Sequence, residues 1–480
     1  VRMCIRDRQN HHHGEALIVI FLGWGVPAEA FTDLKKNQCD ILLLSGYGPG
    51  CAAEAERIIA GKQSAWNYKE IIVIGWSFGV KPASAFIADT SLNITLRIAV
   101  NGTEQHIHPT CGIPPEIFSG TLNGLHAATL RKFRLRTAGT RYNFEKYFGN
   151  ATSDDATVER LRRELQYFAS LPAERSNVSL WDKAVIGECD RIFPPEAQRN
   201  AWQGVDITEV ADMPHLPDFQ WIIDRFVIDK SKVCDKFAQA GDTYEENATI
   251  QKKVARRLLE LSGGIIPQGN LDIIEMGYGH GVFTRMYLDR LASDIHSLTL
   301  VDLDTDPEVG KDTGAIHVKA DVEDVHFINE YLTPESKDVI FSSSMVQWLN
   351  SPATWLRRCA AALRPGGVLA VSFYSGDTFS EISSITGSGL QYPALQSLSD
   401  IARCCGMTIN VATTECETLE FDTPRDALHH LQLTGVNGLS ATASPATVRR
   451  LIREWPLTAS DKARLTFCPA YLVLTKKPKA

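Results

Sequence analysis

Short runs of consecutive apolar residues alternate along this chain with longer segments in which apolar residues recur at helical spacing. This alternation is typical of a mostly parallel sheet with helices on both faces, because strands that are buried on two sides are apolar throughout. The pattern is interrupted by a helix-rich span at residues 114–171 and later begins anew. A first series of strands is predicted at residues 17–22, 41–44, 71–74, 96–100 and 183–186.

A second series of strands is predicted at residues 271–275, 297–303, 339–341, 368–373 and 470–475. Since 480 residues exceed what one hydrophobic core usually organises, we expect two α/β domains, one for each series. No Pro/Gly/Ser-rich linker separates them, so we place the boundary near Asp229, with domains at 16–229 and 230–480. No internal repeat is visible, which argues against repeat architectures.

The first residues of the chain lie outside this pattern. They contain MCIRD, which is also the translation of a transposon-end sequencing adapter, and we interpret residues 1–15 as an artefact or a disordered segment. The cluster His11, His12 and His13 could hold a metal ion, but beside such a terminus we favour solvated or tag-derived histidines. No metal site is predicted.

Charge and cysteine content narrow the function classes. The net charge of −8 comes from interspersed acidic and basic residues, and without a polycationic stripe nucleic acid is not an expected partner. The 11 cysteines lack the CxxC spacing of zinc or iron–sulfur sites and fit a reducing, cytoplasmic compartment. The apolar runs are too short to span a bilayer, so no membrane partner is expected.

A candidate nucleophile follows the strand predicted at 71–74. Residues 75–79 have the sequence GWSFG, a GxSxG motif between a strand and a segment of helical character. In this context the glycines permit the tight turn that lifts the hydroxyl of Ser77 to the carboxyl edge of the sheet. A small turn residue is the alternative interpretation of Ser77.

Two further residues follow in the order serine, acid, histidine that is typical of α/β-hydrolases. Asp190 lies after the strand at 183–186, and His215 follows it in MPHLP. We predict Ser77 as the nucleophile, His215 as its general base, and Asp190 as the carboxylate that orients the imidazole. Glu104 and Glu116 are alternative acids if Asp190 faces away.

The oxyanion hole of this fold takes one amide from the end of the first strand and one from the residue after the nucleophile. LGWG closes the first strand, so the backbone amides of Trp24 and Phe78 are the predicted donors to the developing oxyanion. An aromatic residue packed at a strand end is the alternative for Trp24.

The first domain resembles a known family. The strings LGWG, GWSFGV, NGT, GIPPEIF, LRKFRLR, GECDRIFPPEAQ and MPHLP are similar to those of BioG-type pimeloyl carrier-protein methyl esterases, over residues 16–224. The segment 104–110 departs from that family, with histidines in place of a more acidic stretch. The resemblance implies an α/β-hydrolase carboxylesterase that hydrolyses the methyl ester of pimeloyl-acyl carrier protein.

We expect the helix-rich span at 114–171 to be a lid over Ser77. Its apolar residues Phe133, Phe144 and Phe148 would contact the pimeloyl methylenes. The basic run at 131–136 would dock the acidic carrier protein, with a solvated helix face as the alternative.

In the second domain, the strand at 271–275 ends in Glu275 and leads into MGYGHG, followed by a segment of helical character. A dinucleotide-binding loop has the different spacing GxGxxG. Glycines at every second position are instead typical of S-adenosylmethionine (SAM) dependent methyltransferases. We therefore predict that the cofactor is bound by Glu275, Gly277, Gly279 and Gly281.

Acidic and aromatic residues follow at the ends of the next strands. Asp302 can accept hydrogen bonds from both ribose hydroxyls, with Asp304 as its alternative, and Asp321 resembles the residue that contacts the adenine amine. Trp348 is predicted to lie near the methyl donor and to position the substrate. A solvated strand end, a turn former and a core aromatic are the alternatives for Asp302, Asp321 and Trp348. With LRPGGVLAVSF, these features predict a class I, Rossmann-like methyltransferase fold.

The second domain also resembles a specific family. VCDKFAQAGDTYEENATIQ, SSSMVQWL, FSEISSITGSGL and LEFDTPRDALHHLQLTGVNGL are similar to malonyl carrier-protein O-methyltransferases of the BioC family, over residues 233–477. The resemblance implies SAM as cofactor, and it places Tyr244 and Gln251 over the donor and acceptor. Tyr278 stands where cysteine is commoner. Because an ionised malonyl carboxylate needs no general base, we expect no acid/base dyad here.

Together the resemblances imply one bifunctional enzyme of biotin-precursor synthesis with acyl carrier protein as its partner. Methylation of the malonyl carboxylate removes a charge that apolar elongation enzymes would have to desolvate, and ester hydrolysis restores the acid at pimeloyl length. The alternative is a general acyl carboxylesterase fused to a small-molecule methyltransferase, independent of carrier protein. A binding scaffold whose sites have decayed is a further alternative.

Overall fold

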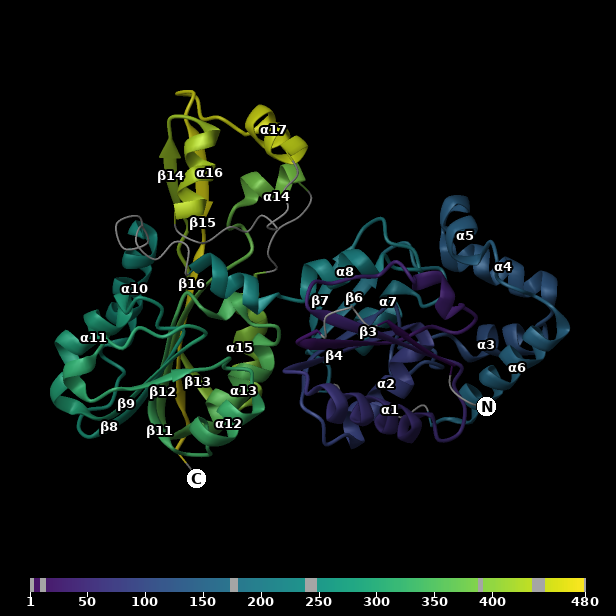
Figure 1. Cartoon of the computed structure of the whole chain (residues 1–480), viewed down its shortest axis with the longest axis horizontal. Coiled ribbons are helices and arrows are strands. Elements are labelled where there is room, and N and C mark those ends of the chain that lie inside the picture. The colour runs from purple at the N-terminus through teal and green to yellow at the C-terminus, as the bar shows by residue number, and fades with distance from the viewer. Residues whose placement is uncertain are drawn as a thin grey trace. The chain divides into compact units, whose positions relative to one another are not determined.

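The computed structural model describes residues 4–8, 14–172, 180–237, 248–386, 392–433 and 445–478. The chain divides into two compact units, Val1–Asp224 and Arg225–Ala480. The border falls inside α8 (Phe219–Phe226), whereas the sequence placed it near Asp229. Figure 1 shows both units as sheets flanked by helices, as expected for two α/β domains.

The first unit contains a seven-stranded sheet in the order β1-β3-β2-β4-β5-β6-β7. Strands β2 to β7 are parallel, and every residue of β2 is buried, which explains its unbroken apolar sequence. The strands are β1 (Cys4–Arg8), β2 (Ala16–Phe21), β3 (Cys39–Ser45), β4 (Glu70–Trp76), β5 (Ile94–Val100), β6 (Lys183–Gly187) and β7 (Asp206–Val210).

Helices cover this sheet and extend beyond one end of it. The span predicted to be rich in helix contains α3 to α6, which Figure 1 shows together to one side of the strands. The helices are α1 (Cys51–Trp66), α2 (Val80–Asp89), α3 (Pro115–Asn123), α4 (Ala127–Ala138), α5 (Arg141–Phe148), α6 (Asp155–Ser170) and α7 (Pro195–Ala201).

Strand β1 corrects one expectation. Its five residues lie within the segment 1–15 that we interpreted as an artefact or disordered, yet they pair antiparallel with β3. Disorder is therefore not what the structure shows at these residues, because the outer edge of β3 offers unpaired backbone groups to a further strand. The histidine cluster at 11–13 lies outside the described residues.

The second unit contains a seven-stranded sheet in the order β10-β9-β8-β11-β12-β16-β13. The first five strands of this order are parallel, and β16 runs antiparallel to both of its neighbours. The strands are β8 (Leu271–Met276), β9 (Ile295–Asp302), β10 (Ile316–Lys319), β11 (Lys337–Ser343), β12 (Leu363–Tyr374), β13 (Met407–Thr414) and β16 (Pro469–Lys476).

A two-stranded sheet, β14 (Glu417–Phe421) with β15 (Ala463–Phe467), accompanies α14, α16 and α17 at one end of this unit (Figure 1). The pairing places Cys416 opposite Cys468, and the two form a disulfide with a Cα–Cα distance of 4.0 Å. The helices are α10 (Thr249–Ser262), α11 (Val282–Leu291), α12 (Val325–Tyr331), α13 (Pro352–Ala362), α14 (Ser380–Thr386), α15 (Leu395–Cys404), α16 (Pro424–Leu433) and α17 (Pro445–Glu454).

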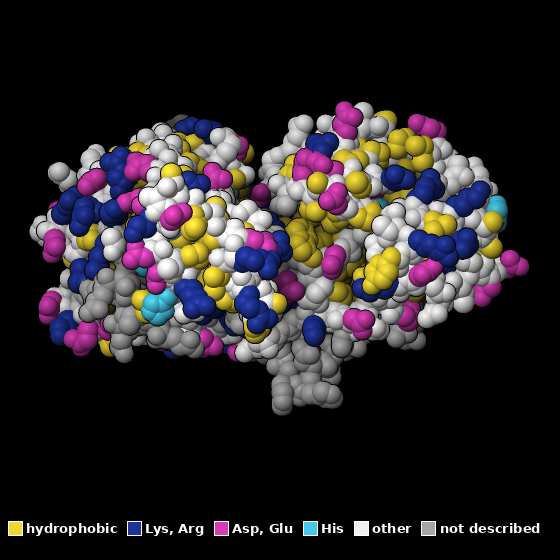
Figure 2. Space-filling view, turned by 90° about the horizontal axis from the view of Figure 1, so that it is seen from above, with side chains coloured by type: hydrophobic (Ala, Val, Ile, Leu, Met, Phe, Trp, Pro, Cys, Tyr) yellow, Lys and Arg dark blue, Asp and Glu magenta, His cyan; other side chains and the backbone are white. Residues whose placement is uncertain are grey.

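Within the described ranges, no helix is long and apolar enough to cross a bilayer, and no cluster of histidine, cysteine and acidic residues could hold a metal ion. On the face shown in Figure 2, basic side chains are interspersed with acidic ones. Function therefore has to be argued from the two sites at the carboxyl edges of the sheets.

Candidate active sites

Ser77 lies directly after β4 in a tight strand-to-helix turn. Its φ of 58° is a left-handed conformation that is strained for a residue with a side chain, as a nucleophile elbow requires. The neighbouring glycine explains how the turn packs, since a Cβ at Gly79 would lie 2.2 Å from the carbonyl oxygen of Phe21. The motif thus has the geometry that its sequence context indicated.

The structure brings Ser77, His215 and Asp190 together although they are far apart in the sequence. His215 Nε2 lies 2.9 Å from Ser77 Oγ, and His215 Nδ1 lies 2.9 Å from Asp190 Oδ2. All three residues are buried. A histidine held between a hydroxyl and a carboxylate in this way can remove the hydroxyl proton as the oxygen attacks a carbonyl carbon.

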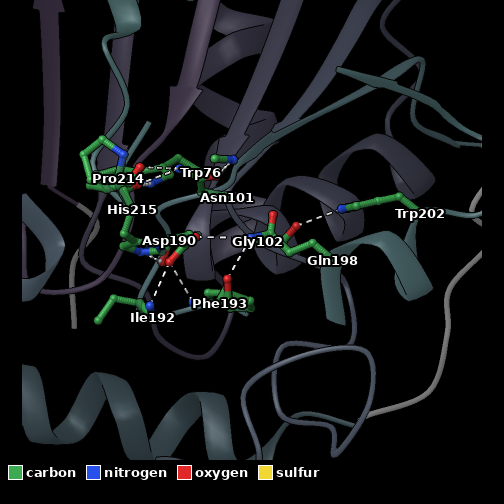
Figure 3. Close-up of polar contacts among 12 residues, drawn as sticks. Trp76, Asn101, Gly102, Asp190, Ile192, Phe193, Gln198, Trp202, Pro214 and His215 are labelled. Atoms are coloured by element: carbon green, nitrogen blue, oxygen red, sulfur yellow. Dashed lines mark hydrogen bonds and ion pairs between the residues drawn. The ribbon is translucent and has the colours of Figure 1, made fainter. Parts of the chain in front are cut away.

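The Asp190 carboxylate accepts several additional hydrogen bonds, visible in Figure 3. Its Oδ1 accepts from the backbone amides of Ile192 at 2.7 Å and Phe193 at 3.0 Å, and its Oδ2 accepts from Gln198 Nε2 at 3.2 Å. These donors hold the carboxylate in a fixed position beside His215. The ring of Phe193 stacks on that of His215 at an interplanar angle of 8°, which fixes the imidazole plane.

The two alternative acids lie elsewhere. Glu104 is buried, and its Oε1 accepts a hydrogen bond from Trp181 Nε1 at 3.0 Å. Glu116 is exposed in α3. Among the three candidates, Asp190 is the carboxylate that the structure places in hydrogen-bonding contact with His215.

Sequence reasoning missed the residue that ties this site together. Asn101, in the NGT string after β5, has a φ of 44° and is fully buried. Its Nδ2 donates to the carbonyl oxygens of Pro214 at 2.8 Å and His215 at 3.0 Å, and its Oδ1 accepts from Gly187 N at 2.7 Å. Trp76 Nε1 also donates to the His215 carbonyl, at 2.8 Å. Its place directly after a buried strand was the feature of the sequence that could have identified it.

The predicted oxyanion residues flank the nucleophile. A Cβ at Gly23 would lie 2.9 Å from Ser77 Cβ, so the end of β2 closely approaches the nucleophile at the residue before Trp24. The Trp24 ring is buried, donates from Nε1 to the carbonyl of Leu161 at 2.9 Å, and packs edge-on against Phe133. Phe78 follows Ser77 directly in the turn.

The residues of the predicted lid divide into a buried and an exposed set. Phe133 and Phe148 are buried, and Phe144 packs against Phe148 at a centroid distance of 6.0 Å. Arg134 corrects the expectation of a continuous basic docking run, because its guanidinium is buried and donates to the carbonyls of Gly25 and Thr152. Its burial follows from the helical period, which turns Phe133 and Arg134 inward and leaves exposed Arg131, Lys132 and Arg136.

In the second unit, the loop after β8 has the backbone that its glycines allow. Gly277, Gly279 and Gly281 have φ values of 79°, 51° and 72°, which other residues rarely adopt. Space is left open above the loop, since a Cβ at Gly279 would meet nothing within 4 Å. A ligand can therefore approach the backbone closely at this point.

Two acids border this loop. Asp302 ends β9, and its Oδ2 accepts from Gly279 N at 2.8 Å; burial raises the pKa of this carboxyl above its usual value. Glu275 is fully buried, and its Oε2 accepts from Thr284 Oγ1 at 2.7 Å and Tyr287 OH at 2.9 Å. Burial raises the pKa of Glu275 to about 7, although these two hydrogen bonds oppose the rise.

One pocket is lined by most of the residues predicted for the second site, namely Glu275, Gly277, Gly279, Asp302, Asp321, Gln251 and Trp348. Gly281 is not among the lining residues and lies at the N-terminus of α11. Asp304, the alternative to Asp302, lines the pocket too, but is exposed and paired with Lys319. Tyr244 lies outside the described residues.

Tyr278, which stands where cysteine is commoner, has a role that the sequence did not indicate. It is buried, and its hydroxyl oxygen accepts a hydrogen bond from Asp306 N at 2.7 Å. This contact ties the glycine loop to the loop after β9. The two loops that border the pocket are thus held by Tyr278 as well as by Asp302.

The pocket residues fit a polar, cationic cofactor with a planar aromatic ring system. The amide atoms of Gln251 and Glu275 Oε1 are buried and have no hydrogen-bond partner among the described residues, so a ligand can satisfy them. Val233, Phe237 and Leu303 supply apolar surface in the same pocket, and Trp348 packs edge-on against Phe237.

Comparisons with known proteins match both halves of the chain. The family described as "Pimeloyl-ACP methyl esterase BioG" matches residues 5–221, and the family described as "Methyltransferase domain" matches residues 274–371. A malonyl-[acyl-carrier protein] O-methyltransferase of Bacteroides fragilis (strain 638R) is 29% identical over 481 residues, with 96% of this chain and 93% of the relative covered.

Two further relatives each match one half. The malonyl-[acyl-carrier protein] O-methyltransferase of Bacteroides thetaiotaomicron is 28% identical over 52% of this chain and 99% of the relative. The crystal structure of BioG from Haemophilus influenzae is 25% identical, covers 45% of this chain and 94% of that chain, and has a TM-score of 0.36. S-adenosylmethionine is the cofactor of the second domain. The chain therefore joins a BioG-type domain at residues 5–221 to a SAM-dependent methyltransferase domain that includes residues 274–371.

Proposed function

We propose that this chain catalyses two reactions of biotin-precursor synthesis. Its second domain methylates the free carboxylate of malonyl-acyl carrier protein, and its first domain hydrolyses the methyl ester of pimeloyl-acyl carrier protein. The relatives named for malonyl-acyl carrier protein and the BioG match support these substrates. The main support for the esterase mechanism is the position of His215. Its Nε2 lies 2.9 Å from Ser77 Oγ, and its Nδ1 lies 2.9 Å from Asp190 Oδ2.

In the esterase reaction, Ser77 Oγ attacks the ester carbonyl carbon while His215 Nε2 takes its proton. The backbone amides of Trp24 and Phe78 stabilise the oxyanion, His215 returns the proton to the leaving methoxide as methanol departs, and water then hydrolyses the acyl-enzyme with His215 as base. Asp190 keeps the imidazole in the tautomer whose Nε2 accepts. Asn101 and Trp76 act through the backbone of His215, which they hold in place.

In the methyl transfer, the cofactor supplies an electrophilic methyl group on a sulfonium. Glu275 and Asp302 hold the polar parts of the cofactor, and the glycine loop lets its backbone approach closely. Gln251 offers a buried amide beside the acceptor, and Trp348 with Phe237 excludes water. The malonyl carboxylate is ionised already, so these residues position and desolvate the reactants rather than move a proton.

The alternative is an esterase and methyltransferase that act on free small molecules. Carrier-protein dependence separates the two, because only the first proposal needs malonyl and methyl-pimeloyl groups presented as thioesters of the carrier. The test compares each reaction on carrier-bound and on free thioester substrates. Equal specificity constants for both forms would contradict the proposal.

Two binding measurements test the alternative of a scaffold whose sites have decayed. A fluorophosphonate probe should label the full chain at Ser77, and calorimetry should show one SAM site. Absence of labelling at Ser77 in the folded protein would remove the esterase mechanism, and absence of SAM binding would remove the methyltransferase.

A further inference from the structure

The segment just before the methyltransferase sheet forms part of the cofactor pocket. Residues 230–237 are helical, and four of their side chains line the pocket: Lys230, Val233, Cys234 and Phe237. The segment is attached to the rest of the unit near its start, where Ile228 N donates to Asn350 Oδ1 at 2.8 Å. Lys230 is the basic residue among these four, and the sequence alone indicated no role for it.

Lys230 forms ion pairs with two carboxylates at one end of the pocket. Its ammonium contacts Asp321 Oδ2 and Glu323 Oε2, and its side chain is only 11% exposed. Glu323 is buried and also accepts from the backbone amides of Asn350 and Ser351, so its carboxylate is fixed in position. Asp321 Oδ1 accepts from Glu323 N at 2.9 Å. One ammonium thus joins a fixed carboxylate to one that faces the pocket.

We propose that Lys230 is a positioning residue for the adenine of the cofactor. Its ammonium holds the Asp321 carboxylate in the orientation in which that carboxylate accepts a hydrogen bond from the 6-amino group. Two neighbouring carboxylates would otherwise repel each other, and Asp321 would turn towards solvent when an apolar ring covers it. Each carboxylate oxygen accepts more than one hydrogen bond, so Asp321 can contact Lys230 and adenine together. The inference rests on the proposed cofactor site.

The test uses the full chain and two ligands that differ at one position of the base. S-adenosylhomocysteine carries the 6-amino group, whereas S-inosylhomocysteine carries an oxygen there that would face the carboxylate. Wild-type protein should prefer the adenosyl ligand by about tenfold or more, as for loss of a hydrogen bond to a charged group. In Lys230→Met, calorimetry should show this preference reduced to about threefold or less.

The ratio of the two dissociation constants is the readout, because it does not depend on the fraction of folded protein. Lys232→Met is the matched control, since Lys232 lies on the same helix and pairs with Asp229. This control should keep the wild-type preference.

An unchanged preference in Lys230→Met, or tighter binding of S-adenosylhomocysteine, would overturn the role of Lys230; tighter binding would mean that Lys230 competes with adenine for Asp321. Wild-type protein that binds neither ligand would instead overturn the proposed cofactor site itself. The two failures are therefore distinguishable.

Discussion

The esterase site and the methyl-donor pocket satisfy their buried polar groups in different ways. At the esterase site, Ser77, His215 and Asp190 bond to one another, and Asp190 takes three further hydrogen bonds from the protein. At the methyl-donor pocket, the Gln251 amide and Glu275 Oε1 have no partner among the described residues. A serine must be activated by its neighbours before substrate arrives, whereas a sulfonium methyl brings its own reactivity. The first site is thus complete without ligand, and the second leaves polar atoms for one.

The largest expected effect comes from removing the nucleophile of the esterase site. Ser77→Ala should lower ester hydrolysis about 10⁶-fold, the loss typical of a missing triad serine. SAM binding and methyl transfer should persist, because the two sites lie on separate sheets with separate cores. Both activities are measured on the same preparation. Loss of methyl transfer in folded Ser77→Ala would show that the two units do not work independently.

A second prediction concerns the futile cycle that the two proposed activities would create on one chain. The esterase must spare newly made malonyl methyl ester, and four extra methylenes at about 0.8 kcal/mol each can supply roughly a hundredfold preference for the pimeloyl ester. Phe133 lies in the span predicted to form a lid and packs on Trp24, whose backbone amide is a proposed oxyanion donor, so Phe133→Ala should reduce this preference.

The measurement compares kcat/KM for malonyl and pimeloyl methyl esters on one carrier protein. Leu135→Ala is the matched control, since Leu135 lies on the same helix but is 36% exposed. Equal specificity constants for the two esters in the wild-type protein would refute selection by chain length.

Asp302→Ala should weaken SAM binding by about 1.5–3 kcal/mol, the range for losing hydrogen bonds to a charged group. The hydrogen bond that Gly279 N donates to Asp302 Oδ2 would also be lost. Asp304→Ala serves as the control and should have little effect, because the Asp304 side chain is 59% exposed and paired with Lys319. Calorimetry on both variants decides which of the two aspartates binds the ribose. Weaker SAM binding in Asp304→Ala alone would assign the ribose contact to Asp304.

Much of the fold could be predicted because its strands are buried on both faces. Every predicted strand overlaps a strand of one of the two sheets. A short continuous apolar run bounded by glycine or polar residues is typical of a strand that is buried on both faces. The missed strands lie at sheet edges or in the small sheet. In β13 and β14, residues alternate between half-buried and exposed, so no apolar run marked them.

The site residues that belong to a local motif could be predicted from the sequence, whereas those defined by long-range contacts could not. Ser77 and the glycine loop are local motifs, and the order of the acid and histidine located the other two members. Asn101 contacts a residue 113 positions away and Lys230 contacts one 91 positions away, so their partners emerge only when the chain is folded. The Cys416–Cys468 disulfide joins residues 52 positions apart, so this pairing was not predicted from the sequence either.

The smallest predicted effect is a pH dependence of stability and of SAM affinity in the second unit. Burial raises the pKa of Glu275 to about 7, above the 4.5 of an unfolded chain. Without ligand, the second unit should therefore lose stability as the pH rises from about 4.5 through 7, because ionisation of the buried carboxyl is penalised. SAM carries a net positive charge, so its binding favours the ionised form.

SAM affinity should consequently rise by up to about tenfold between pH 6 and pH 8, with release of one proton from Glu275 on binding near pH 6. Calorimetry in buffers of different ionisation enthalpy measures that proton directly. Glu275→Gln keeps the size of the side chain and an acceptor for Thr284 and Tyr287 but cannot ionise, so both the proton release and the pH dependence should disappear. Proton release that persists in Glu275→Gln would assign the ionisation to another group, for which Asp302, whose pKa is also raised by burial, is the first candidate.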